Sequence, residues 1–153
     1  MRYWLMKSEP SEFSIDDLQR VGTEPWDGVR NYQVRNMFRD EFKVGDRALF
    51  YHSNCQEIGV VGEMVVTSEA YPDPTQFDPH DTHYDPKSDP ANPRWLLVEV
   101  SFVAKYPRVV TLSELRSDKR FADLALVRKG NRLSVLPLSK THFQTIRQLS
   151  KIK

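Results

Sequence analysis

The sequence predicts an α+β fold built on a mostly antiparallel sheet or a small barrel, and three observations lead to this class. Short apolar segments suited to strands recur along the chain, and helix-like segments separate only some of them. Neighbouring strands without an intervening helix pair antiparallel, because a parallel pair needs a long crossover. The 153 residues, 39% of them hydrophobic, suffice for one packed core, so we expect a single domain over 1–153.

The first half of the chain is expected to alternate between strands and helices. Residues 3–6 form a first strand, and a helix follows between the cap Ser14 and the stop signal Gly22. A second helix runs from about residue 31 to 40, where apolar residues recur at helical spacing. Segments 47–52 and 58–66 are expected strands, and Gly59 and Gly62 indicate a bulge or a close backbone approach in the second.

The second half opens with an unusual segment, residues 71–93, which contains six of the ten prolines and five aspartates. Because proline cannot donate a hydrogen bond to a sheet, we expect a long, semi-rigid loop that is ordered against the barrel rim. After it we expect a strand at 96–104, a short helix opened by the capping box Thr111 to Glu114, a strand at 133–136, and a terminal helix after Ser139.

Composition excludes several classes of protein. The 22 Lys and Arg residues against 21 Asp and Glu residues leave a net charge of +1, which excludes a polybasic binder that depends on bulk charge. The only cysteine, Cys55, excludes an internal disulfide and a CxxC site. The chain has neither a membrane-length apolar stretch nor a signal-peptide pattern, so we expect no membrane association and a cytoplasmic location.

The richest cluster of polar and aromatic side chains lies at the entrance to the second expected helix. Trp26 and Tyr32 offer stacking faces, while Arg30 and Asn31 offer directed hydrogen bonds beside the free amides of a helix start. An equally good interpretation is that Trp26 fills the core and Asn31 only caps the helix. A second cluster, Tyr51, Ser53 and Asn54, ends a strand and on residue types alone is better explained as a turn.

Catalytic and metal sites are weakly indicated. A thiol nucleophile at Cys55 with His52 lacks a recognisable third group, and His80 and His83 in the acidic loop lack a known ligand pattern. We therefore expect no catalytic residue, metal or cofactor. Two alternatives stay open: a hydrolase or base-modifying enzyme that uses Asp27, Glu9 or Cys55, and a protein-interaction module that uses the proline-rich loop.

Seven separated blocks of the sequence resemble the signature of the EVE domain, in family order and across nearly the whole chain. They include YWLMKSEP at 3–10, WDGVRNYQ at 26–33 and FYHSNC at 50–55. The others are EAYPD at 69–73, YDP at 84–86, NPRW at 92–95 and RLSVLPL at 132–138.

This resemblance implies a PUA-like fold, a small mixed barrel with flanking helices that is related to YTH domains. It also implies a non-catalytic reader of a modified base, with modified cytosine in DNA as the leading ligand, and leaves RNA and a free nucleotide open. The partner is then a nucleic acid, and protein partners are not predicted. The implied binding residues are Trp26, Arg30, Asn31, Tyr32, Tyr51, Ser53, Asn54 and Trp95, with Lys7, Ser8 and Glu9 in support. Of these, Trp26, Asn31, Tyr32, Ser53 and Trp95 are expected to line one cavity.

Overall fold

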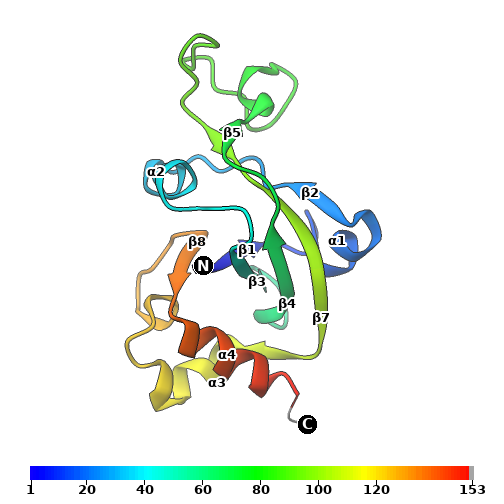
Figure 1. Ribbon diagram of the computed structural model, residues 1–153, viewed down its shortest axis with the longest axis vertical. Coiled ribbons are helices and arrows are strands. Elements are labelled where there is room, and N and C mark those ends of the chain that lie inside the picture. Colours follow the sequence, from blue (N-terminus) through cyan, green and yellow to red (C-terminus); the bar gives the residue numbers. More distant parts are fainter. Residues whose placement is uncertain (152–153) are drawn as a thin grey trace.

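A six-stranded sheet in the order β2-β7-β4-β3-β1-β8 curls into a half-barrel at the centre of the molecule (Figure 1). The structure is a computed structural model and describes residues 1–151. Strand β1 (Tyr3–Ser8) pairs in parallel with β3 (Arg47–His52), and the other neighbouring pairs of this sheet are antiparallel. The predicted α+β class with a mostly antiparallel sheet is therefore confirmed.

The remaining elements complete the half-barrel and its surroundings. The other strands of the large sheet are β2 (Thr23–Pro25), β4 (Gly59–Val66), β7 (Glu99–Thr111) and β8 (Val135–Leu138). A two-stranded ribbon joins β5 (Tyr71–Pro72) to β6 (Leu96–Leu97). The helices are α1 (Ile15–Val21), α2 (Tyr32–Asp40), α3 (Leu112–Ser117) and α4 (Lys140–Leu149), with short 3-10 turns η1 (Pro74–Phe77), η2 (Lys119–Phe121) and η3 (Ala125–Val127).

Both faces of the sheet are covered by helices. Successive strand residues point to opposite faces, so Trp4 and Met6 join one core while Leu5 joins the other. The first core contains the apolar side chains of α1 and α2, and the second contains those of α3 and α4. Figure 1 shows α3 and α4 at one end of the molecule and the segment 71–93 at the other, beyond α2.

The helices begin where their capping residues predict. The side chain of Ser14 accepts a hydrogen bond from the amide of Asp17, and Asn31 accepts one from the amide of Val34. Thr111 and Ser139 cap α3 and α4 in the same way. Each cap satisfies an amide that has no partner within its own helix.

Three strand predictions need correction. The segment predicted at 96–104 is interrupted at Val98, and its second part continues to Thr111 as β7. The strand predicted at 133–136 lies at 135–138, where Pro137 is tolerated because β8 is at the edge of the sheet. Strand β2 was not predicted, because three residues that end in proline carry no alternating pattern.

The close approach predicted at the glycines of β4 is present. A Cβ atom added at Gly59 would lie 2.3 Å from the carbonyl oxygen of Val110, and one added at Gly62 would lie 2.5 Å from that of Ala104. The register shifts near these positions mark the bends that curl the sheet.

We therefore expect Gly59→Ala to lower the free energy of unfolding by about 1–3 kcal/mol, since a backbone oxygen cannot move aside as a side chain would. Urea denaturation measures this, with Ser113→Ala on the exposed side of α3 as the control. Equal stability of the two variants would show that β7 can yield at this point.

Candidate functional site

A cavity of about 470 Å³ opens where the end of β1, the segment from β2 to α2, the 71–93 loop and the start of β8 meet. This volume lies within the range of small-ligand sites. Five of the predicted binding residues line it: Lys7, Ser8, Trp26, Arg30 and Asn31. Residues outside that predicted set also contribute, among them Glu12, Phe13, Glu24, Asp27, His83 and Ser134. Glu24 and His83 were missed because the short strand β2 and the contact of the 71–93 loop had no signal in the sequence.

Trp26 belongs both to the core and to the cavity wall. Its side chain is 7% exposed, and its ring meets the ring of Phe50 edge-on at a centroid distance of 5.4 Å. Its amide donates to the carbonyl oxygen of Val98, which lies between β6 and β7. Trp26 therefore fills the core as one interpretation predicts, and the same ring borders the cavity, so its binding role stays a prediction.

Asn31 is both a helix cap and a residue of the cavity lining. Its Oδ1 atom accepts the amide of Val34 at 3.0 Å and so caps α2. Its side chain also lies on the cavity wall, and its Nδ2 atom donates to no residue within 1–151. The amide group thus keeps a hydrogen-bond donor available at the cavity.

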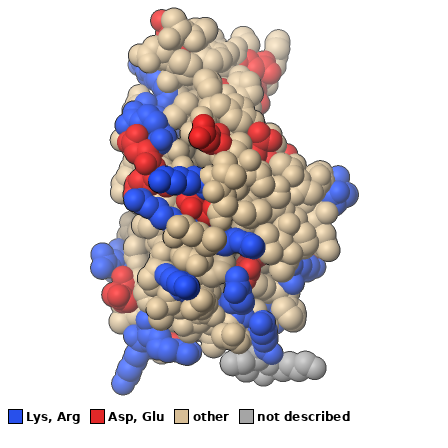
Figure 2. Space-filling view, in the orientation of Figure 1, with Lys and Arg blue, Asp and Glu red and all other residues tan. Residues whose placement is uncertain are grey.

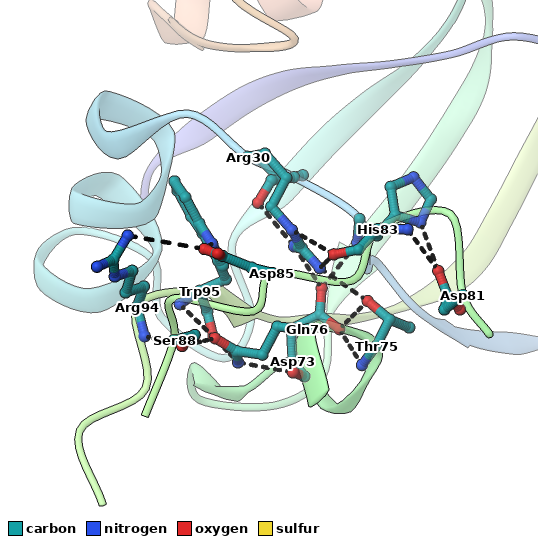
Figure 3. Close-up of polar contacts among 12 residues, drawn as sticks. Arg30, Asp73, Thr75, Gln76, Asp81, His83, Asp85, Ser88, Arg94 and Trp95 are labelled. Carbon is teal, nitrogen blue, oxygen red and sulfur yellow. Dashed lines mark hydrogen bonds and ion pairs between the residues drawn. The ribbon is translucent and has the colours of Figure 1, made fainter. Parts of the chain in front are cut away.

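Arg30 is held by partners within the chain, as Figure 3 shows. Its guanidinium donates twice to the carbonyl oxygen of His83, at 3.0 and 2.7 Å, and once each to Asp73, Thr75 and the carbonyl of Val29. These bonds use all five of its N–H groups. Arg30 thus fastens the 71–93 loop to the cavity wall, and none of its N–H groups is left for the directed hydrogen bond to a ligand that the sequence predicts.

Asp73 is the buried counterpart of Arg30. Its side chain has no exposed surface, and it accepts hydrogen bonds from Arg30, from the amide of Gly28 and from Thr75. Burial alone would raise the pKa of this carboxyl group, but the bonds from Thr75, Gly28 and Arg30 outweigh it and lower the pKa. Asp73 is therefore an ionised structural group at neutral pH.

The same loop holds Trp95 away from the cavity. The indole Nε1 atom of Trp95 donates to Asp85 at 2.7 Å, while its backbone groups bond to the side chain of Gln76 (Figure 3). Gln76 is fully buried and also accepts from Ser88. These contacts order residues 71–93 as expected, and His83 reaches the cavity wall. Most of the segment, however, extends beyond α2 and not along the barrel rim (Figure 1).

The prediction of one cavity shared by five residues is wrong for Tyr32, Ser53 and Trp95, which lie outside its lining. Tyr32 is half exposed and packs on Trp95 at a ring distance of 4.7 Å, on the outer side of Arg30. The backbone amide of Ser53 donates to the carbonyl oxygen of Ser8, and this bond holds Ser53 directly after the end of β3. Sequence blocks that lie together in the fold need not open onto the same cavity.

Three further candidates also lie off the cavity lining. Tyr51 is buried in the second core, and this burial raises the pKa of its phenol to about 12. Asn54 donates its side-chain amide to Glu9 at 2.9 Å, a contact between segments 45 residues apart, and its own φ of 50° is typical of a turn. The turn interpretation of this block thus describes its geometry, and a binding role for these three residues stays a prediction.

Lys7 and two carboxylates set the electrostatics of the cavity. Burial lowers the pKa of Lys7, whose ammonium has no carboxylate within 4.0 Å among residues 1–151. Burial and then the charge of Asp73 raise the pKa of Asp27, and burial followed by Asp27 raises that of Glu24. The cavity lining therefore combines one unpaired cation, Lys7, with the carboxylates of Glu24 and Asp27.

We expect Asp27→Asn to stabilise the protein at pH 7, because a neutral amide avoids the cost of burying a charged carboxylate near Asp73. The gain should be only roughly 0.5–1 kcal/mol, because solvent still screens this carboxylate. Since the pKa of Asp27 is raised on folding, stability falls as the pH rises from its ordinary value of 3.8 through the raised value. The advantage of the variant should therefore vanish at low pH. Urea denaturation between pH 3.5 and pH 7 tests this, with the exposed Glu69→Gln as the control. A constant difference over that range would contradict it.

The histidines and the aspartate of the thiol and metal alternatives have other partners. The Nε2 atom of His52 accepts the backbone amide of Ile15, so this imidazole is occupied away from Cys55. His83 contacts Asp81 through Nδ1, and Asp85 is bound to Trp95. No group of three potential metal ligands gathers within residues 1–151, and no helix there has the length and apolar character to cross a membrane.

Comparison with known proteins places these observations in a family. The EVE domain model matches residues 2–149. Human thymocyte nuclear protein 1 is 42% identical over 97% of this chain and 74% of its own length. A protein structure from Pseudomonas syringae is 44% identical, with a TM-score of 0.93 over 97% of this chain and 99% of that one.

A structure of human THYN1 protein in complex with 5-methylcytosine-containing DNA is 41% identical, with a TM-score of 0.93 over 100% of this chain and 99% of that chain. A YTH domain from Zygosaccharomyces rouxii, only 13% identical, shares the fold at a TM-score of 0.56 over 99% of this chain and 87% of that one. The half-barrel is thus the PUA-like fold that the sequence blocks imply, and the chain belongs to the EVE domain family.

Proposed function

We propose that the chain binds nucleic acid and holds one modified base, with modified cytosine in DNA preferred, in the cavity beside Trp26. The observation that carries this proposal is the combination of Trp26, Asn31 and Lys7 in the lining of one cavity. An aromatic side chain, a free amide donor and an unpaired cation together suit a heteroaromatic base joined to a phosphate. The human relative bound to 5-methylcytosine-containing DNA supports the choice of base and polymer.

Each wall of the cavity offers a different contact to such a base. Trp26 and Phe13 provide apolar surface against the ring and its methyl group. The carboxylate of Asp27 can accept a hydrogen bond from the exocyclic amine of cytosine, while Asn31 can donate to a ring acceptor. This division gives recognition of the base edge to polar groups and recognition of the methyl group to apolar ones.

The energetics favour weak, modification-dependent binding. Stacking a base on an aromatic side chain contributes about 1–3 kcal/mol, whereas taking it out of a duplex costs a few kcal/mol. Since the net charge is only +1, general attraction to a polyanion adds little. Single-stranded DNA should therefore bind at least as well as a duplex of the same sequence.

The deciding experiment is a titration by fluorescence anisotropy of short labelled oligonucleotides. Single- and double-stranded DNA and RNA are compared, each with one modified or unmodified cytosine or adenine. We expect the 5-methylcytosine DNA to bind more tightly than its unmodified twin. Equal affinity for every modified and unmodified pair would refute the function as a modified-base reader.

Asn31→Ser should remove base discrimination while leaving the helix intact. Serine caps a helix about as well as asparagine, but its hydroxyl does not extend into the cavity as the amide does. We expect the preference among bases to fall by about 1–3 kcal/mol, which is the energy of one good side-chain contact to a base edge. Gln33→Ser on the exposed side of the same helix is the matched control. A similar loss of preference in both variants would remove Asn31 from the recognition of the base.

One observation favours a second candidate function. Asp27 is a cavity carboxylate with a raised pKa, a property shared by many general acids. A base-modifying enzyme would protonate its ligand through this group. Mass spectrometry of the oligonucleotide after long incubation with excess protein separates the two functions, since a reader returns the DNA unchanged and an enzyme does not.

A further inference from the structure

The net charge of +1 conceals a strong separation of charge along the chain. Residues 1–115 contain 12 Lys and Arg against 19 Asp and Glu, whereas residues 116–153 contain 10 Lys and Arg against 2 Asp. The break falls within α3. Everything before it is acidic on balance, and everything after it is strongly basic.

This separation is also visible on the surface. In Figure 2 blue side chains predominate over the end formed by α3, α4 and the chain between them, while red ones are more frequent toward the 71–93 end. Arg116, Lys119, Arg128, Lys129 and Arg132 are exposed and have no carboxylate within 4.0 Å among residues 1–151. The two aspartates of this region are already engaged, Asp118 by Arg120 and Asp123 by His142. The positive charge of this surface is therefore not neutralised from within.

The basic surface reaches the cavity through the start of β8. Ser134 lines the cavity, and its carbonyl oxygen accepts the amide of Lys7 at 2.8 Å. Arg132 lies two residues before Ser134, in a turn that is held by Asn131. The backbone amide of Asn131 donates to the carbonyl oxygen of Arg128, and the side chain of Asn131 accepts the amide of Leu133. This turn therefore precedes Ser134 on the cavity lining by only a few residues.

Tyr51 provides a second contact between the cavity residue Lys7 and the basic surface at α3. The Lys7 ammonium lies 5.8 Å from the centre of the Tyr51 ring, and Arg116 is near enough to that phenol to lower its pKa, against the larger effect of burial. The cavity lining itself contains the carboxylates of Glu12, Glu24 and Asp27, and His83 brings the acidic 71–93 loop to it. The carboxylates thus lie in the lining, whereas the exposed cations of residues 128–132 precede Ser134 in the chain.

We propose that Arg116, Arg128, Lys129 and Arg132 form a phosphate-binding surface that carries the nucleic-acid backbone on either side of the held base. The backbone then passes the cavity along its β8 side, because the acidic 71–93 loop would repel it. The cations contact phosphates, which are the same in every sequence, and therefore contribute affinity without base preference. The preference for a base comes from the cavity. This inference rests on the proposed function, from which it takes the identity of the polymer.

The test compares two triple variants that change the net charge equally. Arg128→Gln/Lys129→Gln/Arg132→Gln removes cations of the proposed surface, and Lys43→Gln/Lys87→Gln/Lys105→Gln removes exposed lysines elsewhere. Circular dichroism first establishes that both are folded. The probe is a labelled 12-base DNA strand with one 5-methylcytosine, and its unmethylated twin, titrated between 50 and 200 mM NaCl.

We expect the first variant to bind at least ten-fold more weakly at 50 mM NaCl and to lose about two units of the slope of log affinity against log salt, since each phosphate contact on a single strand contributes about 0.7. The preference for the methylated strand should be unchanged, and the second variant should keep the wild-type slope. Equal slopes in all three proteins, or an equal loss in both variants, would overturn the surface while leaving the proposed function standing. If the wild-type protein binds the methylated and unmethylated strands equally, the proposed function is refuted. A salt slope that is reduced only in the first variant would still support the phosphate-binding surface.

Discussion

Replacing Arg30 with alanine should lower the free energy of unfolding by about 3–5 kcal/mol, because it leaves the buried carboxylate of Asp73 without its cation. The side chain of Asp73 has no exposed surface, and that of Arg30 is only 21% exposed. The same change removes two hydrogen bonds to the carbonyl of His83. The loop should therefore separate from the cavity wall, and nucleic-acid affinity should fall with it.

Urea denaturation of Arg30→Ala, Asp73→Asn and the double variant measures this coupling. The double variant should be more stable than the sum of the two single losses predicts, since the uncompensated charge is gone. Arg94→Ala is the control, because Arg94 lies 3.9 Å from Asp85 in a partly exposed pair. Arg30→Lys should not rescue stability, as an ammonium group cannot replace five fixed donors. Losses of equal size in Arg30→Ala and Arg94→Ala would contradict the assigned role.

The elements that could be predicted from the sequence are those that local chemistry determines. Ser14, Asn31, Thr111 and Ser139 marked the helix starts because a cap is a contact over three residues. Strand β2 could not be found in this way. It is a strand only because β7 lies beside it, and that partner is more than 70 residues away in the chain.

The site was partly predictable for the same reason. Trp26, Arg30 and Asn31 are neighbours in sequence and stay neighbours at the cavity. The contacts of Arg30 could not be predicted, because four of its five hydrogen bonds go to residues 73–83 and no local pattern reveals them. His83 was considered only as a metal ligand, whereas the glycine at position 28 leaves room for its ring: a Cβ atom there would lie 2.7 Å from Nε2. The cytoplasmic location stays a prediction.

Replacing Trp26 with alanine should weaken the binding of 5-methylcytosine DNA by about 1–3 kcal/mol, the energy of one base stacked on an aromatic side chain. Because Trp26 also fills the first core, the same change should cost about 3–5 kcal/mol of stability. A loss of binding alone would thus not separate a wall of the cavity from a support of the core.

Phe50→Ala provides that separation. Phe50 is fully buried, touches the edge of the Trp26 ring and does not line the cavity, so its truncation should cost similar stability without removing a surface that a base could touch. Trp26→Phe should retain most of the binding because a stacking face remains. Affinities are compared at a temperature at which circular dichroism shows all three variants folded. Should Phe50→Ala weaken DNA binding as much as Trp26→Ala does, Trp26 supports the cavity only through the core, and the base must be held by the polar groups around Asn31.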